Sequence, residues 1–369
     1  MNRREFMVAG GTALAARFVP DRQKQWAPYA NTLAIDALGG IFPSNPDGSF
    51  SERDLSEIRE SGLSAVVLTL APSGPTRFDE AALHRTLKEL GDWDGRLRAH
   101  PQTLANIRTG VDLASAHDAR KLGLIYGFQD TSPLGEDPKR IDMFYERGVR
   151  VIQLTHNKRN LVGDGCMEPG NAGLSQFGHE VIAALNARRI QIDLAHGGRR
   201  TIKEAIAASK LPVTISHTGC AALCDLPRTV PDDTLRAMAD RGGVAGIIFW
   251  PYLRRDTQPM AEDVIRHIEH AIKVCGEDHV GIGTDGNISP MERTPEFERQ
   301  NREWVESATA DGIFERGRPL PLYTFIPDLN HARRFETLGA MLSARGHSDA
   351  RIAKVLGGNF ARVMSEVWG

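Results

Sequence analysis

The chain has 369 residues, a formal net charge of −2 and 41% hydrophobic residues. This length and apolar content are enough for one large α/β barrel or for two smaller domains. The nearly balanced charge excludes the strongly basic field by which proteins attract nucleic acid or an anionic membrane. We therefore expect no nucleic-acid partner.

The N-terminus has the pattern of an export signal. The adjacent Arg3 and Arg4 precede Phe6 and a short run of small and apolar residues, 8–16. This order is typical of a twin-arginine (Tat) signal, and the run is too short to cross a bilayer as a mature helix. We therefore predict a Tat-like signal and flexible leader over residues 1–30, a periplasmic location and no stable membrane anchor. The cleavage site stays open.

Eight short apolar runs follow the leader. Most of them lack a clean alternation of apolar and polar residues. This pattern is typical of strands that are buried on both faces. The runs are residues 33–38, 64–70, 123–128, 149–154, 190–194, 212–216, 243–249 and 279–283. We predict that each run is a β-strand.

Helical patterns separate these runs. They cover residues 52–60, 80–90, 141–147, 177–186, 201–208, 231–241 and 261–275. The alternation predicts a (β/α)₈ TIM-type barrel over residues 31–369, with an insertion or long loop near 289–321 and C-terminal helices. A doubly wound open sheet is the alternative, but Gly39-Gly40 after the first strand does not match the phosphate turn G-x-G-x-x-G.

Polar residues follow several of the predicted strands. His196 comes directly after the fifth and His217 after the sixth. The active sites of such barrels lie at the C-terminal ends of the strands. The two imidazoles are therefore candidate metal ligands or acid–base groups. The alternative is that each one only forms a hydrogen bond at the end of its strand. The other polar residues that we expect at this rim are Asp36, Gln129, Asp130, His156, Asn157, Arg159, Arg228 and Asp285. Such a rim suits the hydrolysis of a polar, charged substrate.

Several stretches in chain order resemble the membrane (renal) dipeptidase family, peptidase family M19, whose members are metallopeptidases with an amidohydrolase-like, metal-dependent-hydrolase barrel. The matching stretches are residues 154–160, 163–165, 173–178, 192–196, 215–217, 227–233, 280–286 and 356–360. Each stretch is a weak signal alone, but together they span about residues 33–369 and are highly specific.

The resemblance implies a site with two zinc ions, bridged by a glutamate and a hydroxide, that cleaves a dipeptide. His196 and His217 match two histidine ligands of the metals. His156 matches the histidine that stabilises the tetrahedral intermediate, and Arg228 matches the arginine near the substrate carboxylate. Asp285 matches the aspartate that binds the substrate amine and transfers the proton. Members of the family often dimerise, so a homodimer stays open here.

The chain departs from the family pattern at the metal ligands. Leu38 and Gly40 stand where the family has His-x-Asp, and Gln129 stands at the position of the bridging glutamate. A neutral amide brings no negative charge to a bridge between two dications. We therefore predict one zinc ion or none rather than two. The carboxylates that could supply a third ligand are those of Asp36, Asp130 and Asp285.

Three functions stay open from the sequence. The first is an exported dipeptidase-family hydrolase that acts on a small peptide or peptide-derived amide through a metal-activated water. The second is a metal-free barrel enzyme, such as an isomerase, tautomerase or lyase for a peptide-derived metabolite. The third is a periplasmic binding protein without turnover. Two further questions stay open: whether Cys220 and Cys224 pair as a disulfide, and whether Trp250 and Tyr252 line the pocket or pack in the core.

Overall fold

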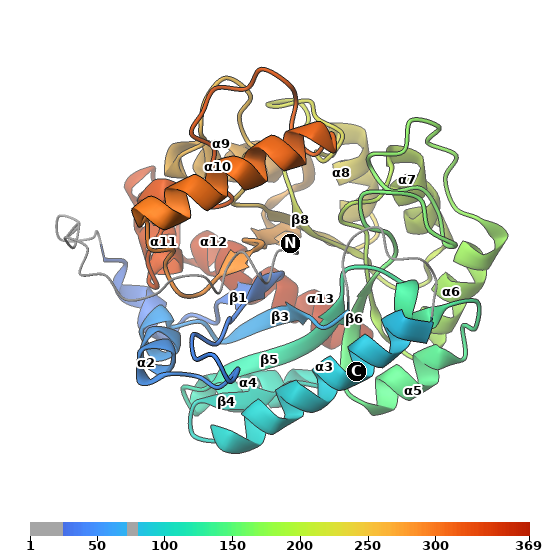
Figure 1. The fold of residues 1–369 in the computed structure, drawn as a ribbon, viewed down its shortest axis with the longest axis horizontal. Helices are drawn as coiled ribbons and strands as arrows, with labels where there is room; N and C mark the ends of the chain where they lie inside the picture. Colours follow the sequence, from blue (N-terminus) through green and yellow to red (C-terminus); the bar gives the residue numbers. More distant parts are fainter. Residues whose placement is uncertain (1–24, 72–79) are drawn as a thin grey trace.

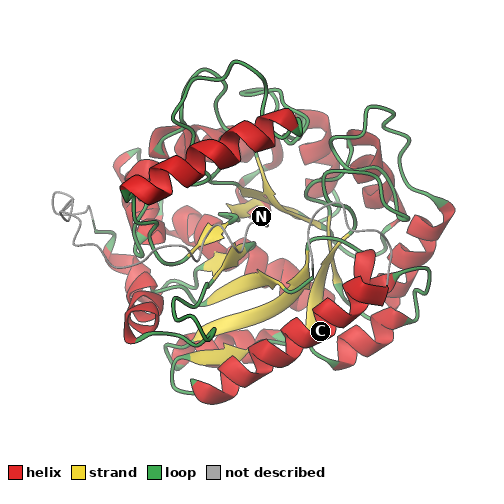
Figure 2. Cartoon of the chain, in the orientation of Figure 1, coloured by secondary structure: helices red, strands yellow, loops and turns green. Residues whose placement is uncertain are grey.

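The computed structural model describes residues 25–71 and 80–369, so most of the predicted export leader lies outside the described residues. Eight parallel strands stand side by side in the order of the chain (Figures 1 and 2). They are β1 (Ile35–Asp36), β3 (Ala65–Thr69), β5 (Leu122–Phe128), β6 (Val149–Gln153), β7 (Gln191–Asp193), β8 (Thr214–Thr218), β9 (Val244–Ile247) and β10 (Val280–Ile282). All eight predicted strands are therefore confirmed.

The first and last strands of this series meet and close the barrel. The backbone N–H of Ala37, just after β1, donates to the carbonyl oxygen of Ile282 at the end of β10, with an N–O distance of 3.0 Å. Beyond this contact the chain forms a small parallel pair of strands, β2 (Gly39–Gly40) and β11 (Gly286–Asn287). The predicted (β/α)₈ architecture is confirmed.

Helices surround the strands in Figure 2. They are α2 (Glu52–Ser61), α3 (Glu80–Ala99), α4 (Gly110–Asp118), α5 (Arg140–Glu146), α6 (Gln176–Ala187), α7 (Arg199–Ala208), α8 (Asp232–Ala239), α9 (Ala261–Cys275), α10 (Pro295–Ala310), α11 (Arg334–Ala344), α12 (Asp349–Ala353) and α13 (Asn359–Trp368). In the part of the chain that the structure describes, no helix has both the length and the apolar character needed to cross a bilayer.

Helix α13 packs against the N-terminal ends of the strands, which leaves the C-terminal ends for a site. Its residues Phe360, Val363 and Val367 are buried in one cluster with residues of β1, β3 and β5. The indole N–H of Trp368 donates to the carbonyl oxygen of Arg150 near the start of β6. This packing covers the end of the barrel opposite to the predicted rim.

Two parts of the sequence prediction need correction. Strand β4 (Leu104–Asn106), which pairs with β5 outside the eight-membered series, was not predicted. The stretch 289–321 is not simply a long loop, because it contains the sixteen-residue helix α10. The hydroxyl of Thr294 caps this helix, and its buried positions Phe297, Asn301 and Val305 recur every four residues. Numerous Glu and Arg residues between these positions hide the helical pattern.

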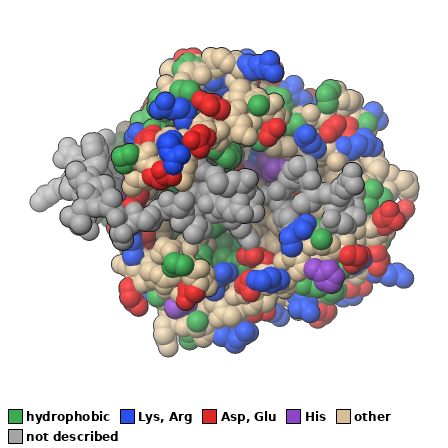
Figure 3. Space-filling view, in the orientation of Figure 1, with side chains coloured by type: hydrophobic (Ala, Val, Ile, Leu, Met, Phe, Trp, Pro, Cys, Tyr) green, Lys and Arg blue, Asp and Glu red, His purple; other side chains and the backbone are tan. Residues whose placement is uncertain are grey.

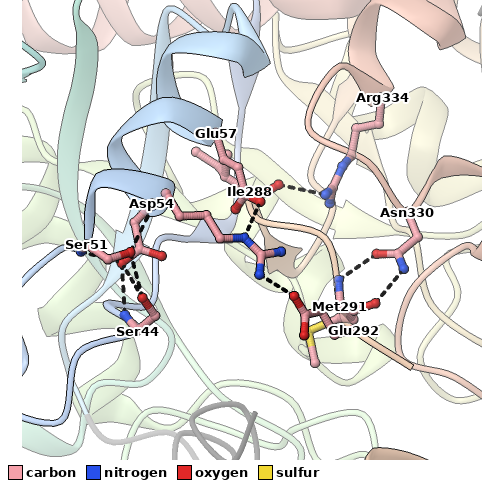
Figure 4. Close-up of polar contacts among 10 residues, drawn as sticks. Ser44, Ser51, Asp54, Glu57, Ile288, Met291, Glu292, Asn330 and Arg334 are labelled. Atoms are coloured by element: carbon pink, nitrogen blue, oxygen red, sulfur yellow. Dashed lines mark hydrogen bonds and ion pairs between the residues drawn. The ribbon is translucent and has the colours of Figure 1, made fainter. Parts of the chain in front are cut away.

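The segment that follows β11 is held by the C-terminal part of the chain (Figure 4). The guanidinium of Arg334 donates to the carbonyl oxygens of Asn287 and Ile288, both at 2.8 Å. The side chain of Asn330 bonds both backbone groups of Met291, at 2.8 and 2.9 Å. The chain that leaves β10 is therefore fixed by side-chain contacts to backbone groups.

Charged side chains of both signs are interspersed on the face shown in Figure 3, with no field of one sign. This distribution agrees with the net charge of −2. Cys220 and Cys224, whose pairing the sequence left open, are free thiols and both are buried.

Candidate active site

The C-terminal ends of β7 and β8 bring His196 and His217 together. Their Nε2 atoms lie 3.0 Å apart, and the two rings are inclined at 61°. His217 is fully buried within β8, whereas His196 lies three residues beyond β7 with a left-handed backbone, φ +62°. The structure therefore places the two predicted histidines at one point of the predicted rim.

The other ring nitrogen of each histidine has a hydrogen-bond partner. Nδ1 of His217 lies 2.7 Å from the hydroxyl of Ser216, which donates its proton to Asp193 at 2.5 Å. Because this proton goes to Asp193, the Ser216 oxygen accepts the Nδ1–H of His217. Nδ1 of His196 likewise donates to the Oδ1 atom of Asn157 at 2.7 Å. Both imidazoles therefore carry the proton on Nδ1 and a lone pair on Nε2.

Asp193, which accepts the hydrogen bond from Ser216, is completely buried. Burial raises the pKa of its carboxyl, while hydrogen bonds from the side chain and backbone of Ser216 and from the backbone of Ala195 oppose that rise. Through Ser216, the carboxyl of Asp193 supports the orientation of His217.

The two Nε2 atoms face each other at 3.0 Å, so a cation between them would be held by both. A zinc ion binds imidazole nitrogen at about 2.0–2.1 Å, and two such nitrogens can lie this close together. Hydrogen bonding of the opposite ring nitrogen is the usual environment of a metal-bound histidine. The chemistry of His196 and His217 therefore fits one metal ion.

The remaining positions do not fit a second metal ion. Leu38 is a buried apolar side chain, and a Cβ atom at Gly40 would lie 2.8 Å from the ring of Phe42. Gln129 approaches the pair, with its amide nitrogen 3.4 Å from Nε2 of His217, but it is uncharged. Within residues 25–71 and 80–369, no three or more His, Cys, Asp or Glu side chains form a group that could hold a metal.

Asp130, considered above as a third ligand, is occupied by loop contacts. Its carboxylate accepts hydrogen bonds from the backbone N–H of His156 at 3.0 Å and that of Ser132 at 2.7 Å, and from the amide of Asn160 at 3.2 Å. Burial raises the pKa of Asp130 against these bonds. The bond to His156 fixes the start of the loop after β6, where the His156 ring stacks on His196 with 4.2 Å between centroids.

Arg228 provides a buried positive charge beside the histidines. Its side chain is 4% exposed, and Nη2 donates to the carbonyl oxygen of His217 at 2.8 Å. Its Nε–H is buried without a hydrogen-bond partner among the described residues. A small cleft borders Arg228 and His196. A guanidinium in this state is suited to bind an anion.

Asp285 follows β10 and lies at the same end of the barrel. Its backbone N–H donates to the carbonyl oxygen of Leu38 at 2.7 Å, and its own carbonyl oxygen accepts from the indole N–H of Trp250 at 3.0 Å. Asp36 is not placed as a metal ligand, because its carboxylate accepts hydrogen bonds from Thr284. The rim therefore gathers imidazoles, a guanidinium and a carboxylate at strand ends.

Sequence reasoning gave no orienting role to three residues of this site: it placed Asn157 at the rim, left Trp250 between pocket and core, and did not single out Ser216. Asn157 and Ser216 fix the histidine tautomers, and Trp250 bonds Asp285. Asn157 and Ser216 each stand next to a predicted histidine in the chain, which is the signal that could have singled them out. Trp250 and Tyr252 are both buried, and through its bond to Asp285 the Trp250 indole also reaches the rim.

Known proteins share this fold and sequence pattern. The sequence profile of the membrane dipeptidases (peptidase family M19) matches residues 43–294. A dipeptidase of Clonostachys rogersoniana, verJ, is 28% identical over 291 residues, which cover 78% of this chain and 66% of that relative, just under two thirds of its length. A dipeptidase of Aspergillus terreus, ataJ, is 25% identical over 376 residues, which cover 92% of this chain and 80% of the relative.

Solved structures agree with the barrel. An amidohydrolase from Pseudomonas aeruginosa is 28% identical with a TM-score of 0.77, and the superposition covers 93% of this chain and 98% of that one. A metallopeptidase from Rhodobacter sphaeroides, solved with a phosphinate mimic of the dipeptide L-Ala-D-Ala, is 19% identical with a TM-score of 0.73, over 91% of this chain and 100% of that chain. The profile match covers more than half of the chain. The chain belongs to the membrane dipeptidase family of hydrolases, peptidase family M19.

Proposed function

We propose that this protein hydrolyses the amide bond of a dipeptide or a similar small peptide-derived substrate, with one metal ion rather than two. The observation that carries the proposal is the pair of Nε2 atoms of His196 and His217, 3.0 Å apart, beside the buried guanidinium of Arg228. A metal ion between the two histidines would lie next to a substrate carboxylate bound by Arg228, which is the arrangement that hydrolysis of a zwitterionic dipeptide by a metal-activated water requires.

Each side chain has a role in this proposal. A metal ion held by His196 and His217 would supply a water of lowered pKa as the nucleophile. Arg228 binds the carboxylate end of the substrate and thereby fixes the direction of the peptide. Asp285 binds the substrate amine, accepts a proton from the attacking water and passes this proton to the leaving nitrogen. His156, stacked on His196, stabilises the negative charge that develops on the carbonyl oxygen.

Metal content and turnover test this proposal together. We expect the purified protein, after growth with added zinc, to hold close to one equivalent of metal and to cleave members of a panel of dipeptides. His196→Ala should lose both properties, whereas His179→Ala, on an exposed position of α6, should keep both. Protein without metal and without dipeptide cleavage would contradict the proposal.

A second function is favoured by a specific observation. Leu38, Gly40 and Gln129 supply no charged ligand, so only the imidazoles of His196 and His217 remain for a metal among the residues that the structure describes. Without a metal, His217 and His196 could still exchange protons with a bound substrate, as an isomerase, tautomerase or lyase requires. Turnover of a peptide-derived substrate that survives complete chelation would support this function over hydrolysis. Tight binding without any turnover would instead support a binding protein.

We also propose export through the twin-arginine route, which rests on Arg3, Arg4 and the apolar run that follows them. Residues 1–30 fused to a folded reporter should carry the reporter to the periplasm. Replacing both arginines by lysine should leave the reporter in the cytoplasm, whereas a variant of Glu5 should not. Equal export of the lysine variant would contradict the proposal.

A further inference from the structure

Asp285 has a backbone conformation that side-chain-bearing residues rarely adopt, with φ at +53°. A non-glycine residue in the left-handed region is held there by its surroundings, and such residues concentrate at functional sites. The backbone conformation determines the direction of the Cα–Cβ bond. The contacts that fix the backbone of Asp285 therefore also determine the direction of its carboxylate.

Hydrogen bonds fix the peptide groups around Asp285. Its N–H donates to the carbonyl oxygen of Leu38, in the segment that follows β1. The preceding residue, Thr284, is bound by Asp36 through both its backbone N–H and its hydroxyl. The carbonyl oxygen of Asp285 accepts from Nε1 of Trp250 at 3.0 Å. Two contacts come instead from the chain that follows β9: the one with Trp250, and the backbone N–H of Phe249, which donates to the carbonyl oxygen of Thr284 at 3.3 Å.

Trp250 is itself fixed by other aromatic rings. Its indole stacks on Tyr252 at 5.8 Å and 14°, and meets the edge of Trp304 at 6.0 Å and 80°. Phe314 contacts all three of these rings, and both Trp250 and Phe314 are buried. Trp304 belongs to α10, drawn in orange in Figure 1, and Phe314 follows that helix. The stretch 289–321 is thus connected to Asp285 through one indole ring.

We propose that Trp250 is a positioning residue for Asp285, and that α10 acts on the site through it. The indole N–H holds the Asp285 peptide in its left-handed conformation, and Trp304 holds the indole. This inference rests on the proposed role of Asp285 in binding the substrate amine. It adds that the helical insertion controls how that carboxylate is directed.

The alternative is that Trp250 only fills space. Two replacements separate the hydrogen bond from the packing. Trp250→Phe keeps an aromatic ring without a donor, and 3-benzothienylalanine at position 250 keeps the full ring size with sulfur in place of the N–H. The same analogue at position 304 is the matched control, because it preserves the Trp250–Asp285 bond. Tyr252→Phe is a second control, since it keeps the stacked ring.

Crystal structures of these variants decide the positioning claim without reference to activity. We expect φ of Asp285 to leave the left-handed region in both position-250 variants and to stay near +53° in both controls. A left-handed Asp285 in the benzothienylalanine variant would overturn the proposal.

Kinetics test whether the conformation matters for the reaction. We expect kcat/KM for a dipeptide to fall about 10- to 100-fold in the position-250 variants, the effect of a small misplacement of a reacting group. In an Asp285→Asn background the same replacement should cause no further loss. A further loss of equal size would show that Trp250 acts independently of Asp285 and would overturn the proposal. If the wild type cleaves no dipeptide, the proposed function fails, and the crystal structures still decide the positioning claim.

Discussion

The carboxylate of Asp36 accepts two hydrogen bonds from Thr284, one from the backbone N–H at 2.8 Å and one from the hydroxyl at 2.5 Å. These bonds join the end of β1 to the end of β10, where the barrel closes. Asp36 is 2% exposed, and burial raises the pKa of its carboxyl to about 7, against the opposing effects of Thr284 and Arg334. The fold therefore binds a proton at Asp36 more tightly than the unfolded chain does.

This difference predicts how stability depends on pH. Because the pKa is raised from 3.8 to about 7, the contribution of Asp36 to stability is fully present below pH 4 and is lost as the pH rises to about 7. We expect its share of the free energy of unfolding to fall by up to about 1.4 kcal/mol per pH unit within this window.

Asp36→Asn tests this prediction, because the amide is neutral at every pH and keeps one acceptor oxygen. Urea unfolding of the wild type and the variant between pH 4 and pH 8 gives the difference in stability at each pH. This difference should shift in favour of the variant as the pH rises to about 7 and then level off. A difference that is constant across the range would contradict the assignment.

Arg228 provides a prediction about ligand recognition. The Nε–H of its buried guanidinium has no hydrogen-bond partner among the described residues, so a substrate carboxylate could accept from it. We expect Arg228→Ala to weaken the binding of a dipeptide phosphinate by about 2 kcal/mol or more, measured by calorimetry. The same phosphinate with a C-terminal carboxamide is the control ligand, since it lacks the anion. Equal weakening for both ligands would show that Arg228 acts instead by holding the carbonyl oxygen of His217.

Gln129 provides a prediction about the metal. Its amide lies 3.4 Å from Nε2 of His217, so Gln129→Glu would place a negative charge beside the histidine pair. We expect the affinity for zinc to rise at least about tenfold, which is about 1.4 kcal/mol, in a competition titration with a chromogenic chelator. The stoichiometry should stay at one ion, because Leu38 and Gly40 still supply no ligand. Gln129→Met, of similar size and uncharged, is the control, and binding of two ions by Gln129→Glu would contradict this prediction.

The sequence was sufficient for the barrel because its strands are buried on both faces. All seven residues of β5 (Leu122–Phe128) are buried, and such runs are recognisable without any other information. Strand β4 was missed because it has three residues and only Leu104 is buried. Helix α10 was missed because charged residues surround a narrow apolar stripe.

The same limit applies to the site. The place of His196 and His217 follows from their positions directly after strands, since parallel strands end at one rim. The contact between Trp250 and Asp285 joins residues 35 positions apart in two different loops. Neither loop has a periodic pattern from which side-chain directions could be predicted. The direction of the indole depends on packing against Trp304, a residue distant in the sequence.

Gly357 provides a prediction about the base of the barrel. It lies in the turn between α12 and α13, where a Cβ atom would come within 2.4 Å of the carbonyl oxygen of Leu33 and 2.6 Å of the nitrogen of Ile35. Both atoms belong to the backbone that leads into β1, so no side chain can move aside. We expect Gly357→Ala to lower the free energy of unfolding by about 1–3 kcal/mol, the usual effect of overpacking.

The adjacent Gly358 is the matched control for this substitution. A Cβ atom there would lie 3.2 Å from its nearest neighbour, the carbonyl oxygen of Ala353, and alanine favours the helix by up to about 1 kcal/mol over glycine. Gly358→Ala should therefore unfold at nearly the same urea concentration as the wild type. If the two variants unfold at the same urea concentration, contact with the β1 backbone is not what requires glycine at position 357.

A shift of β1 in Gly357→Ala would also move Asp36, so this variant should lose turnover along with stability, whereas Gly358→Ala should lose neither.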